Sequence, residues 1–368
     1  MLKSLRLKNF TLFPDADLAF GKHLNVIIGE NGLGKTHMLK AAYCVLAVSA
    51  QGLKDSVSEN PTKGHLQKAI ANKLRGVFKP DEIGRLARRQ AGRNRSEVEC
   101  RFDDPRFDLR FSFNTSSKTE VAIDSSPAAW MTEVPVYLPT RELLTIAPGF
   151  VSLYETTHLQ FEETWKDTVL LLGAPLAKGP REKKIKKLLQ PLEEAMDGTV
   201  DLDTAGRFYL KTKSGKFEMH LVAEGLRKLA MIARLIATGS LLGKGYLFWD
   251  EPEANLNPKL VKLIARVILN ISQSGIQFFI ATHSLFLMRE LYLLQKQHSS
   301  DLDARYFGLH RGENEGVNVQ PGTTMDEIGD IAALDEELAQ SERYLDTENQ
   351  LGRLTNFNQA EKSQEFRL

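Results

Sequence analysis

The chain has 368 residues, of which 42% are apolar, so it can bury a large core and is not expected to be disordered. Lysine and arginine total 48 against 47 aspartates and glutamates, a balance that selects neither nucleic acid nor a membrane surface. The two cysteines, Cys44 and Cys100, indicate neither a disulfide framework nor a zinc site. We see no signal peptide and no apolar run of about 20 residues, so we expect a cytoplasmic protein without membrane spans.

A glycine-rich loop follows three expected strands near the N-terminus. The last of these strands ends in the apolar run Val26-Ile27-Ile28, and helical spacing of apolar residues begins near Leu39. A loop between a buried strand and a helix is the setting in which backbone N–H groups bind phosphate. Within it, we expect Lys35 to reach the terminal phosphates and the Thr36 hydroxyl to bind Mg²⁺. The expected nucleotide contacts are Gly29, Glu30, Asn31, Gly32, Leu33, Gly34, Lys35, Thr36 and His37.

Two acidic residues follow the strand expected at residues 245–249. Asp250 ends an apolar run, at the position where a doubly wound sheet binds ligands, so we expect its carboxylate to hold Mg²⁺. Glu251 comes next and is expected to orient and deprotonate the attacking water. An acidic pair can also open an exposed turn, but the motifs further along the chain favour a catalytic site.

His283 follows a second apolar strand, expected at residues 277–281. A polar side chain there can reach the terminal phosphate or the attacking water, and we expect His283 to take part in catalysis. A single histidine more often has a structural role, but its place after the strand that follows Asp250 favours function. Asn257 and Ser284 are expected to cap the two neighbouring helices.

The remaining segments predict an antiparallel sheet and a helical insertion. Residues 150–197 read as helices broken at Gly179-Pro180, residues 224–238 as an apolar helix, and residues 51–95 as a polar, basic insertion with weak periodicity. Short strands and hairpins are expected at residues 97–113, 121–123, 134–138, 206–221 and 305–320. We expect one ATPase-sized α/β domain over residues 1–320 and an acidic tail over residues 321–368.

These motifs resemble those of ABC-type ATPases, and within them the soluble branch that contains SMC, RecF and the overcoming-lysogenization-defect proteins. The resemblance lies in Leu5–Phe13, in the phosphate loop, in Asp250–Pro258 and in Ala281-Thr282-His283-Ser284. It implies an α/β fold, namely an ABC ATPase (P-loop NTPase) core with an antiparallel β subdomain and a short helical insertion. It also implies ATP and Mg²⁺ as ligands, and a homodimer whose two copies share each ATP head to tail.

In this family a signature loop of one subunit closes on the ATP held by the other. The matching residues here are Ala223, Glu224 and Gly225. Ala223 stands where the family usually has a serine that reaches the γ-phosphate, whereas Gly225 and the following helix can still supply N–H donors. No convincing glutamine loop is present, because Gln160 is poorly placed, and the turn Thr140-Arg141-Glu142 is the better substitute.

Three charged segments stand out along the chain. Lys73–Arg95 has a net charge of +6 and Lys178–Lys187 of +5, so each either contacts DNA phosphates without sequence preference or is a solvated helix face. Asp326–Asp346 has a net charge of −7, and its leucines 334, 338 and 345 share one face of an expected helix. That face packs on the chain's own core or docks a partner, and we favour the core.

Two pairs of acids, Asp201 with Asp203 and Asp301 with Asp303, resemble the paired acids of a Toprim nuclease domain. Neither pair has a complete domain around it, and we interpret both as loop acids in solvent. We therefore do not expect the chain to cut DNA alone.

The leading hypothesis is a cytosolic ATPase that acts as sensor or scaffold for a separate effector, such as a nuclease. It rests on a resemblance to ATPase subunits of anti-phage systems such as Septu, PARIS and retron-linked systems. The alternative is a RecF-like, DNA-binding ATPase in repair or recombination. A transporter subunit is disfavoured by the opening strand, by Ala223 and by the missing glutamine loop.

Overall fold

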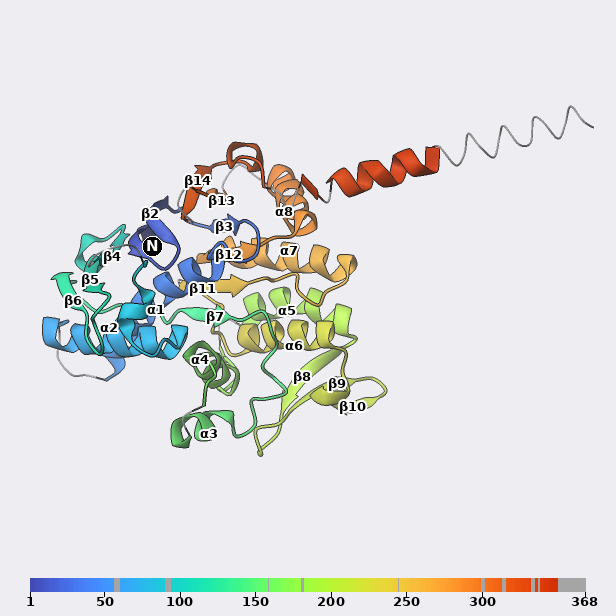
Figure 1. Cartoon of the computed structure of the whole chain (residues 1–368). Coiled ribbons are helices and arrows are strands. Elements are labelled where there is room, and N and C mark those ends of the chain that lie inside the picture. The colour runs from blue at the N-terminus through green and yellow to red at the C-terminus, as the bar shows by residue number, and fades with distance from the viewer. Residues whose placement is uncertain are drawn as a thin grey trace, which may run out of the picture.

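A computed structural model describes the whole chain except residues 56–59, 90–93, 158, 180–181, 244, 299–301, 313–315, 332–334, 337 and 350–368. Its centre is a six-stranded sheet in the order β14-β13-β3-β12-β11-β7 (Figure 1). The strands from β13 to β7 are parallel to one another, and β14 pairs antiparallel at the edge. These strands are β3 (Leu24–Ile28), β7 (Val136–Leu138), β11 (Gly245–Asp250), β12 (Ile276–Thr282), β13 (Ala304–Arg311) and β14 (Val317–Gly322).

Two hydrophobic cores lie on opposite faces of this sheet. Side chains alternate along each strand, so Ile28 and Ile280 enter one core while Ile27 and Phe279 enter the other. Both faces are therefore buried, which is why the strands read as continuous apolar runs. Helices α1 (Lys35–Lys54) and α2 (Lys63–Phe78) contribute to the core on one face. The core on the other face contains residues of α5 (Glu182–Met196), α6 (Glu224–Ala237), α7 (Pro258–Ser272) and α8 (Leu285–His298).

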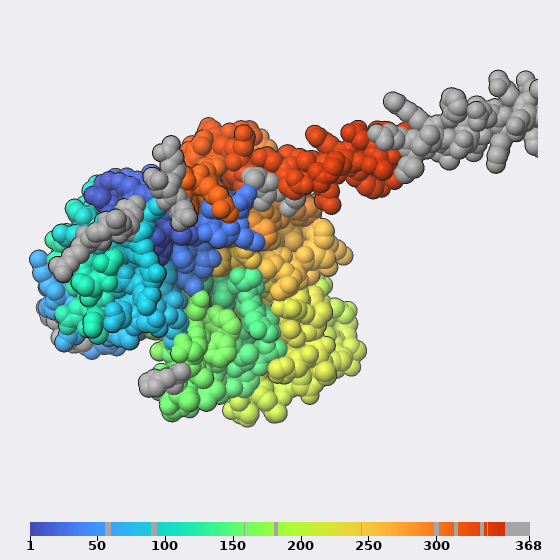
Figure 2. All heavy atoms as spheres, viewed as in Figure 1, coloured from blue at the N-terminus to red at the C-terminus, as the bar shows by residue number. Residues whose placement is uncertain are grey.

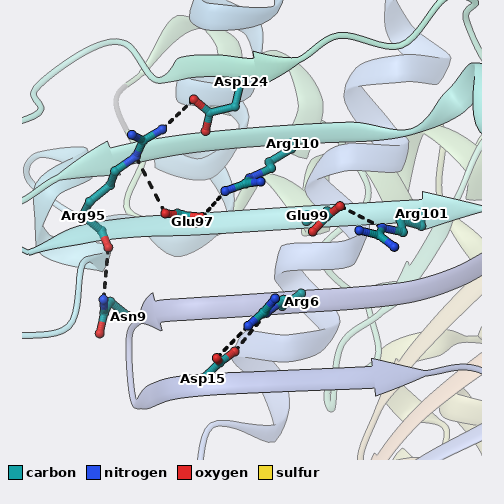
Figure 3. Close-up of polar contacts among 9 residues, drawn as sticks. All are labelled: Arg6, Asn9, Asp15, Arg95, Glu97, Glu99, Arg101, Arg110 and Asp124. Carbon is teal, nitrogen blue, oxygen red and sulfur yellow. Dashed lines mark hydrogen bonds and ion pairs between the residues drawn. The ribbon is translucent and has the colours of Figure 1, made fainter.

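An antiparallel sheet in the order β2-β1-β4-β5-β6 forms a subdomain over α1 and α2 (Figure 1). Its outer face carries charged side chains from neighbouring strands (Figure 3). Three cross-strand ion pairs join them: Arg6–Asp15, Arg95–Asp124 and Arg110–Glu97. The strands are β1 (Leu2–Phe10), β2 (Phe13–Ala19), β4 (Arg95–Phe102), β5 (Leu109–Asn114) and β6 (Ala122–Ser125).

The helical insertion expected at residues 150–197 is present as α3 (Phe150–Thr156), α4 (Glu163–Leu172) and α5. A three-stranded sheet follows it, formed by β8 (Gly198–Leu202), β9 (Phe208–Thr212) and β10 (Gly215–Glu218). The expected hairpin is thus confirmed. Strand β8, which the sequence analysis does not predict, pairs with β9 as a third strand. No helix among the described residues has the length and apolar character to cross a membrane.

The sequence reading also missed α2. The sequence of this segment is polar with weak periodicity, yet a buried stripe runs along the helix. That stripe is formed by Leu66, Ile70, Ala71, Leu74 and Val77. These positions are spaced four, one, three and three apart, which is helical periodicity hidden by the polar residues between them.

Helix α4 is attached to α1 and α2 through buried charges. The Lys73 ammonium lies 2.9 Å from Glu163 and 2.6 Å from Asp167, and the Tyr43 hydroxyl donates to Asp167 at 2.6 Å. Burial alone would lower the pKa of Lys73, but the two carboxylates outweigh it and raise the pKa above its usual value. Lys40 of α1 pairs with Glu162 at 2.5 Å beside the same helix.

The basic segment Lys73–Arg95 is therefore not one free surface among the described residues. Lys73 pairs with α4, and Lys79 contacts the Tyr154 hydroxyl at 3.1 Å. Arg88 is buried and donates to the Leu12 carbonyl at 2.9 Å, so it cannot serve as an exposed phosphate contact. Arg95 is engaged in the cross-strand pairs, and Arg93 lies outside the described residues.

The expected packing of the acidic segment on its own core is wrong for the two leucines that the structure describes. Leu338 is 40% exposed and Leu345 is 59% exposed, on a helix that projects from the body (Figures 1 and 2). Leu334 lies outside the described residues. The segment is instead anchored before this helix, where Ile328 and Ile331 are buried.

Replacing Lys73 with methionine should lower the free energy of unfolding at neutral pH by about 3 kcal/mol, because two largely buried carboxylates lose their cation. Lys68 on the same helix is the matched control, since it is 73% exposed and 4.0 Å from Glu120. Lys68→Met should change the stability by less than about 0.5 kcal/mol. Urea unfolding of both variants measures the difference, and equal stabilities would contradict the described pairing.

Candidate nucleotide-hydrolysis site

The phosphate loop connects β3 to α1 with a backbone that requires glycine. Gly32 and Gly34 have φ angles of 85° and 84°, in the left-handed region that other residues rarely adopt. A Cβ on Gly34 would also lie 2.9 Å from the Phe13 ring. The loop thus turns tightly into α1, and the N-terminus of this 20-residue helix lies directly behind it.

Lys35 comes directly after Gly34, and its side chain turns back against the backbone of the loop. Its ammonium donates to the Gly29 carbonyl at 2.7 Å and to the Glu30 carbonyl at 3.0 Å. Burial lowers its pKa, while the carboxylates of Glu251 and Asp250 act in the opposite direction. The cation is therefore placed next to the loop's backbone, where phosphate oxygens would compete for it.

Asp250 is brought to the loop by the parallel sheet. The Thr36 hydroxyl donates to its Oδ2 at 2.8 Å, although the two residues are 214 positions apart in the chain. Asp250 is 9% exposed. Burial raises its pKa from 3.8 to about 6, and the Thr36 hydrogen bond only partly offsets that effect.

Glu251 and His283 meet beside this pair. His283 Nδ1 lies 3.1 Å from Glu251 Oε1, and the Glu251 backbone N–H donates to the Ala281 carbonyl at 2.9 Å. Glu251 has a φ of 47°, an unusual left-handed conformation for a residue with a side chain. This turn directs the carboxylate toward the end of β12, where it remains partly exposed.

Two further residues of the site were not singled out from the sequence. Lys228 of α6 is buried and donates to the carbonyls of Glu251 and Ala254, at 2.8 Å and 3.1 Å. Burial lowers its pKa to about 8. Glu253 accepts a hydrogen bond from Thr282 at 2.5 Å and lies 4.0 Å from His283. The sequence predicts neither role, because the partners of these two residues are brought together by the fold and not by local spacing.

The signature residues lie at the start of α6, next to the loop after β11. Ala223 is the residue before the helix, and Glu224 accepts a hydrogen bond from the Asn255 side chain at 2.9 Å. A Cβ on Gly225 would lie 3.1 Å from the Asn255 carbonyl, so a glycine permits this close approach. Ala223 and Glu224 are exposed in their own chain.

The turn after β7 is fixed by an internal network. Glu142 is buried and accepts hydrogen bonds from the backbone N–H and the hydroxyl of Thr145. Its Oε1 also lies 3.0 Å from Nε of Arg227 on α6. The turn Thr140-Arg141-Glu142, the expected substitute for a glutamine loop, is thus connected to α6.

His37 differs from the other expected phosphate contacts. Its ring packs against Phe78, 5.6 Å between centroids, and its Nδ1 is buried without a hydrogen-bond partner among the described residues. Burial and the nearby Lys40 lower its pKa to about 4, so the ring is neutral at physiological pH. The side chain of His37 therefore serves packing, and only its backbone N–H remains as a phosphate contact.

The chain matches the protein family described as "AAA domain, putative AbiEii toxin, Type IV TA system" over residues 24–289, which is most of its length. The chain belongs to this family. Among curated relatives, DNA replication and repair protein RecF of Clostridium kluyveri is 33% identical over 79 residues, and that of Lachnospira eligens is 38% identical over 56 residues. These matches cover 20% and 15% of this chain, and only 22% and 15% of the relatives' own length.

Solved SMC heads share the fold. The Smc head bound to the C-winged helix domain of ScpA has a TM-score of 0.53 at 15% identity, covering 88% of this chain and 98% of that one. An Smc head with an extended coiled coil, bound to the C-terminal domain of ScpA from Pyrococcus furiosus, has a TM-score of 0.51 at 12% identity, covering 93% and 99%. The expected α/β fold of an ABC-type ATPase is thereby confirmed.

The residues present fit the Mg²⁺ that this family implies. The Thr36 hydroxyl and the Asp250 carboxylate are hard oxygen donors held 2.8 Å apart. Magnesium takes one or two such ligands from a protein and completes its shell with water and phosphate oxygens. The raised pKa of Asp250 also agrees with a metal site, because a neighbouring cation would stabilise the ionised form of a buried carboxylate.

Asp201 and Asp203 have structural partners away from this site. Asp201 pairs with Lys216 at 2.8 Å, and Asp203 accepts hydrogen bonds from the backbone of Ala205 and Arg207. Asp303 accepts from the Lys22 backbone at 2.9 Å and pairs with Arg305, whereas Asp301 lies outside the described residues.

Replacing Asp250 with asparagine should stabilise the ligand-free protein at neutral pH. An acid whose folded-state pKa is raised from 3.8 to about 6 costs stability when ionised, so the penalty is absent below about pH 4, grows to pH 6 and is complete above it. The neutral amide removes that penalty, which is roughly 3 kcal/mol at most. Urea unfolding at pH 7 and at pH 4 should show a gain only at pH 7, and no gain at pH 7 would contradict the assigned burial.

Proposed function

We propose that this chain hydrolyses ATP at a site shared by two copies, and that it acts as sensor or scaffold for a separate effector. The observation that carries the hydrolytic part is the contact between Glu251 and His283, next to the Thr36–Asp250 pair. A carboxylate, an imidazole and two oxygens suited to a metal, all at one edge of a sheet, can position and deprotonate a water for attack on a phosphate.

In this proposal each residue has one task. Backbone N–H groups of Gly29–Thr36 and the Lys35 ammonium bind the phosphates, while Thr36 and Asp250 would hold Mg²⁺, which would neutralise phosphate charge. Glu251 accepts a proton from the attacking water at its carboxylate, and His283 orients that carboxylate from 3.1 Å. Lys228 donates to the backbone carbonyl of Glu251 and so holds the backbone of the proposed base in one position.

The second copy supplies the signature loop. Ala223, Glu224 and Gly225 face solvent or the loop after β11 in their own chain, which leaves the N-terminus of α6 available to the ATP of a partner. Without a serine hydroxyl at position 223, closure depends on backbone N–H donors and the helix dipole. We propose residues 1–320 as the ATPase domain and residues 321–368 as an acidic tail.

The effector part of the proposal is supported at the level of the family. The family description names a toxin of a type IV toxin–antitoxin system, and the solved SMC head of similar fold was bound to a winged helix domain of ScpA. A chain of this fold can thus present a surface to another protein. The motif resemblance to anti-phage ATPase subunits favours a nuclease as that protein and a role in antiviral defence.

A RecF-like role in DNA repair is the second candidate. It is favoured by the partial matches to RecF proteins of Clostridium kluyveri and Lachnospira eligens. The segment Lys73–Arg95 gives it little support, because Arg88 is buried and Arg95 is paired within the sheet (Figure 3). Stimulation of ATP hydrolysis by DNA at physiological salt would distinguish this role from the effector proposal.

Replacing Glu251 with glutamine should preserve ATP binding and slow hydrolysis by about 100-fold or more, because an amide cannot accept the proton of water. The ATP-bound dimer should then accumulate, which sedimentation in the presence of ATP and Mg²⁺ can measure. Lys35→Ala is the control and should lose ATP binding itself. Turnover close to wild type in the glutamine variant would contradict the assignment and make His283 the next candidate for the base.

A further inference from the structure

The acidic helix near the C-terminus is exposed along its described length. Residues 338–349 are helical, and every one except Ala339 is exposed. Leu338 and Leu345 are seven positions apart and therefore lie on the same face. Acidic residues flank them, among them Glu336, Glu342 and Asp346. A helix with an apolar stripe between acids is suited to an apolar groove edged by cations.

Such a groove lies at the start of α5. It has a volume of about 430 Å³, and its apolar lining is formed by Leu176, Ala177, Ile185, Leu189 and Ala237. Leu176 is 53% exposed. Lys178, Lys183 and Lys187 are exposed on and beside the same helix, and Lys178 also lines the groove. One acid, Glu193, lies in the lining, and burial raises its pKa.

We propose that the acidic helix of one copy docks in the α5 groove of a second copy. The two surfaces are complementary in charge, since residues 335–349 hold six acids and one arginine, a net charge of −5, and Lys178–Lys187 has a net charge of +5. They are also complementary in their apolar content, with Leu338 and Leu345 opposite Leu176 and the groove floor. The interaction pairs two charged segments with each other, and neither of them belongs to the nucleotide site.

The geometry favours a second copy over the same chain. Ile328 and Ile331 fix the base of the segment near β13 and β14, and the helix leaves the body there (Figures 1 and 2). Helix α7 packs against both α8 and α5, so it stands between that base and the groove. The helix projects away from the body (Figures 1 and 2), and Leu338 and Leu345 on it are exposed.

The contact is separate from the nucleotide site. Ala237, in the groove, ends α6, whereas the signature residues stand at its beginning. A helix of 14 residues is roughly 20 Å long, so the groove is about that far from the signature loop. Docking should therefore occur without ATP, and its failure would leave the proposed hydrolysis untouched.

Charge exchange between two variants tests the proposal. The groove variant is Lys178→Glu, Lys183→Glu and Lys187→Glu, and the tail variant is Glu336→Lys, Glu342→Lys and Asp346→Lys. In the Lys35→Ala background without nucleotide, the parent should self-associate at low salt and dissociate as salt screens the contact. Each variant alone should associate about ten-fold more weakly or worse, and mixing the two should restore association, because the reversed groove then meets the reversed tail.

Sedimentation velocity measures the mass of the assemblies that each variant forms. The control for the groove variant is Lys3→Glu, Lys211→Glu and Lys213→Glu, which makes the same charge change at exposed lysines elsewhere. The control should associate like its parent, and Leu338→Asp with Leu345→Asp should not associate. A parent that stays monomeric at every concentration, or a mixture that fails to associate, would overturn the proposal. Unchanged self-association in the groove variant together with lost DNA binding would instead assign the lysines to DNA.

Discussion

The parallel order of the six-stranded sheet is the constraint on which the site depends. Because β3, β12 and β11 are neighbours running in one direction, their ends bring Thr36, His283 and the Asp250-Glu251 pair to one edge. Each strand is buried on both faces, and a slip of one residue would exchange its two sets of core side chains. Packing thus fixes the register, and the register fixes which polar residues emerge at the edge.

Buried charges then connect that edge to the rest of the chain. Lys228 joins α6 to the carbonyl of Glu251, and Arg227 at the preceding position lies 3.0 Å from Glu142 in the turn after β7. Ala223, Glu224 and Gly225 stand at the beginning of the same helix, so the proposed signature loop and the Glu251 carboxylate are mechanically linked. On this account, movement of α6 when a second copy closes is transmitted to Glu251 through the hydrogen bond of Lys228 to the Glu251 carbonyl.

The sequence predicts the groups that stand at strand ends better than those that pair across the fold. The phosphate loop, Asp250 and His283 each follow an apolar run, and local pattern was enough to expect them together at one edge. The sequence does not predict the ion pairs of Lys73, because its partners lie 90 and 94 residues away and only the packing of α4 reveals them. Helix α2 was missed for a related reason, since its polar positions hide the buried stripe.

Complementation between two inactive variants tests most directly whether each site needs two copies. Lys35→Ala removes the phosphate-loop cation but keeps the signature loop, whereas Ala223→Asp places a charge on the exposed signature loop and keeps the phosphate loop. Each alone should be inactive. An equal mixture should recover about a quarter of wild-type turnover, because half of the dimers are mixed and each has one intact site. No recovery from two folded variants, or full activity of Ala223→Asp alone, would contradict a shared site.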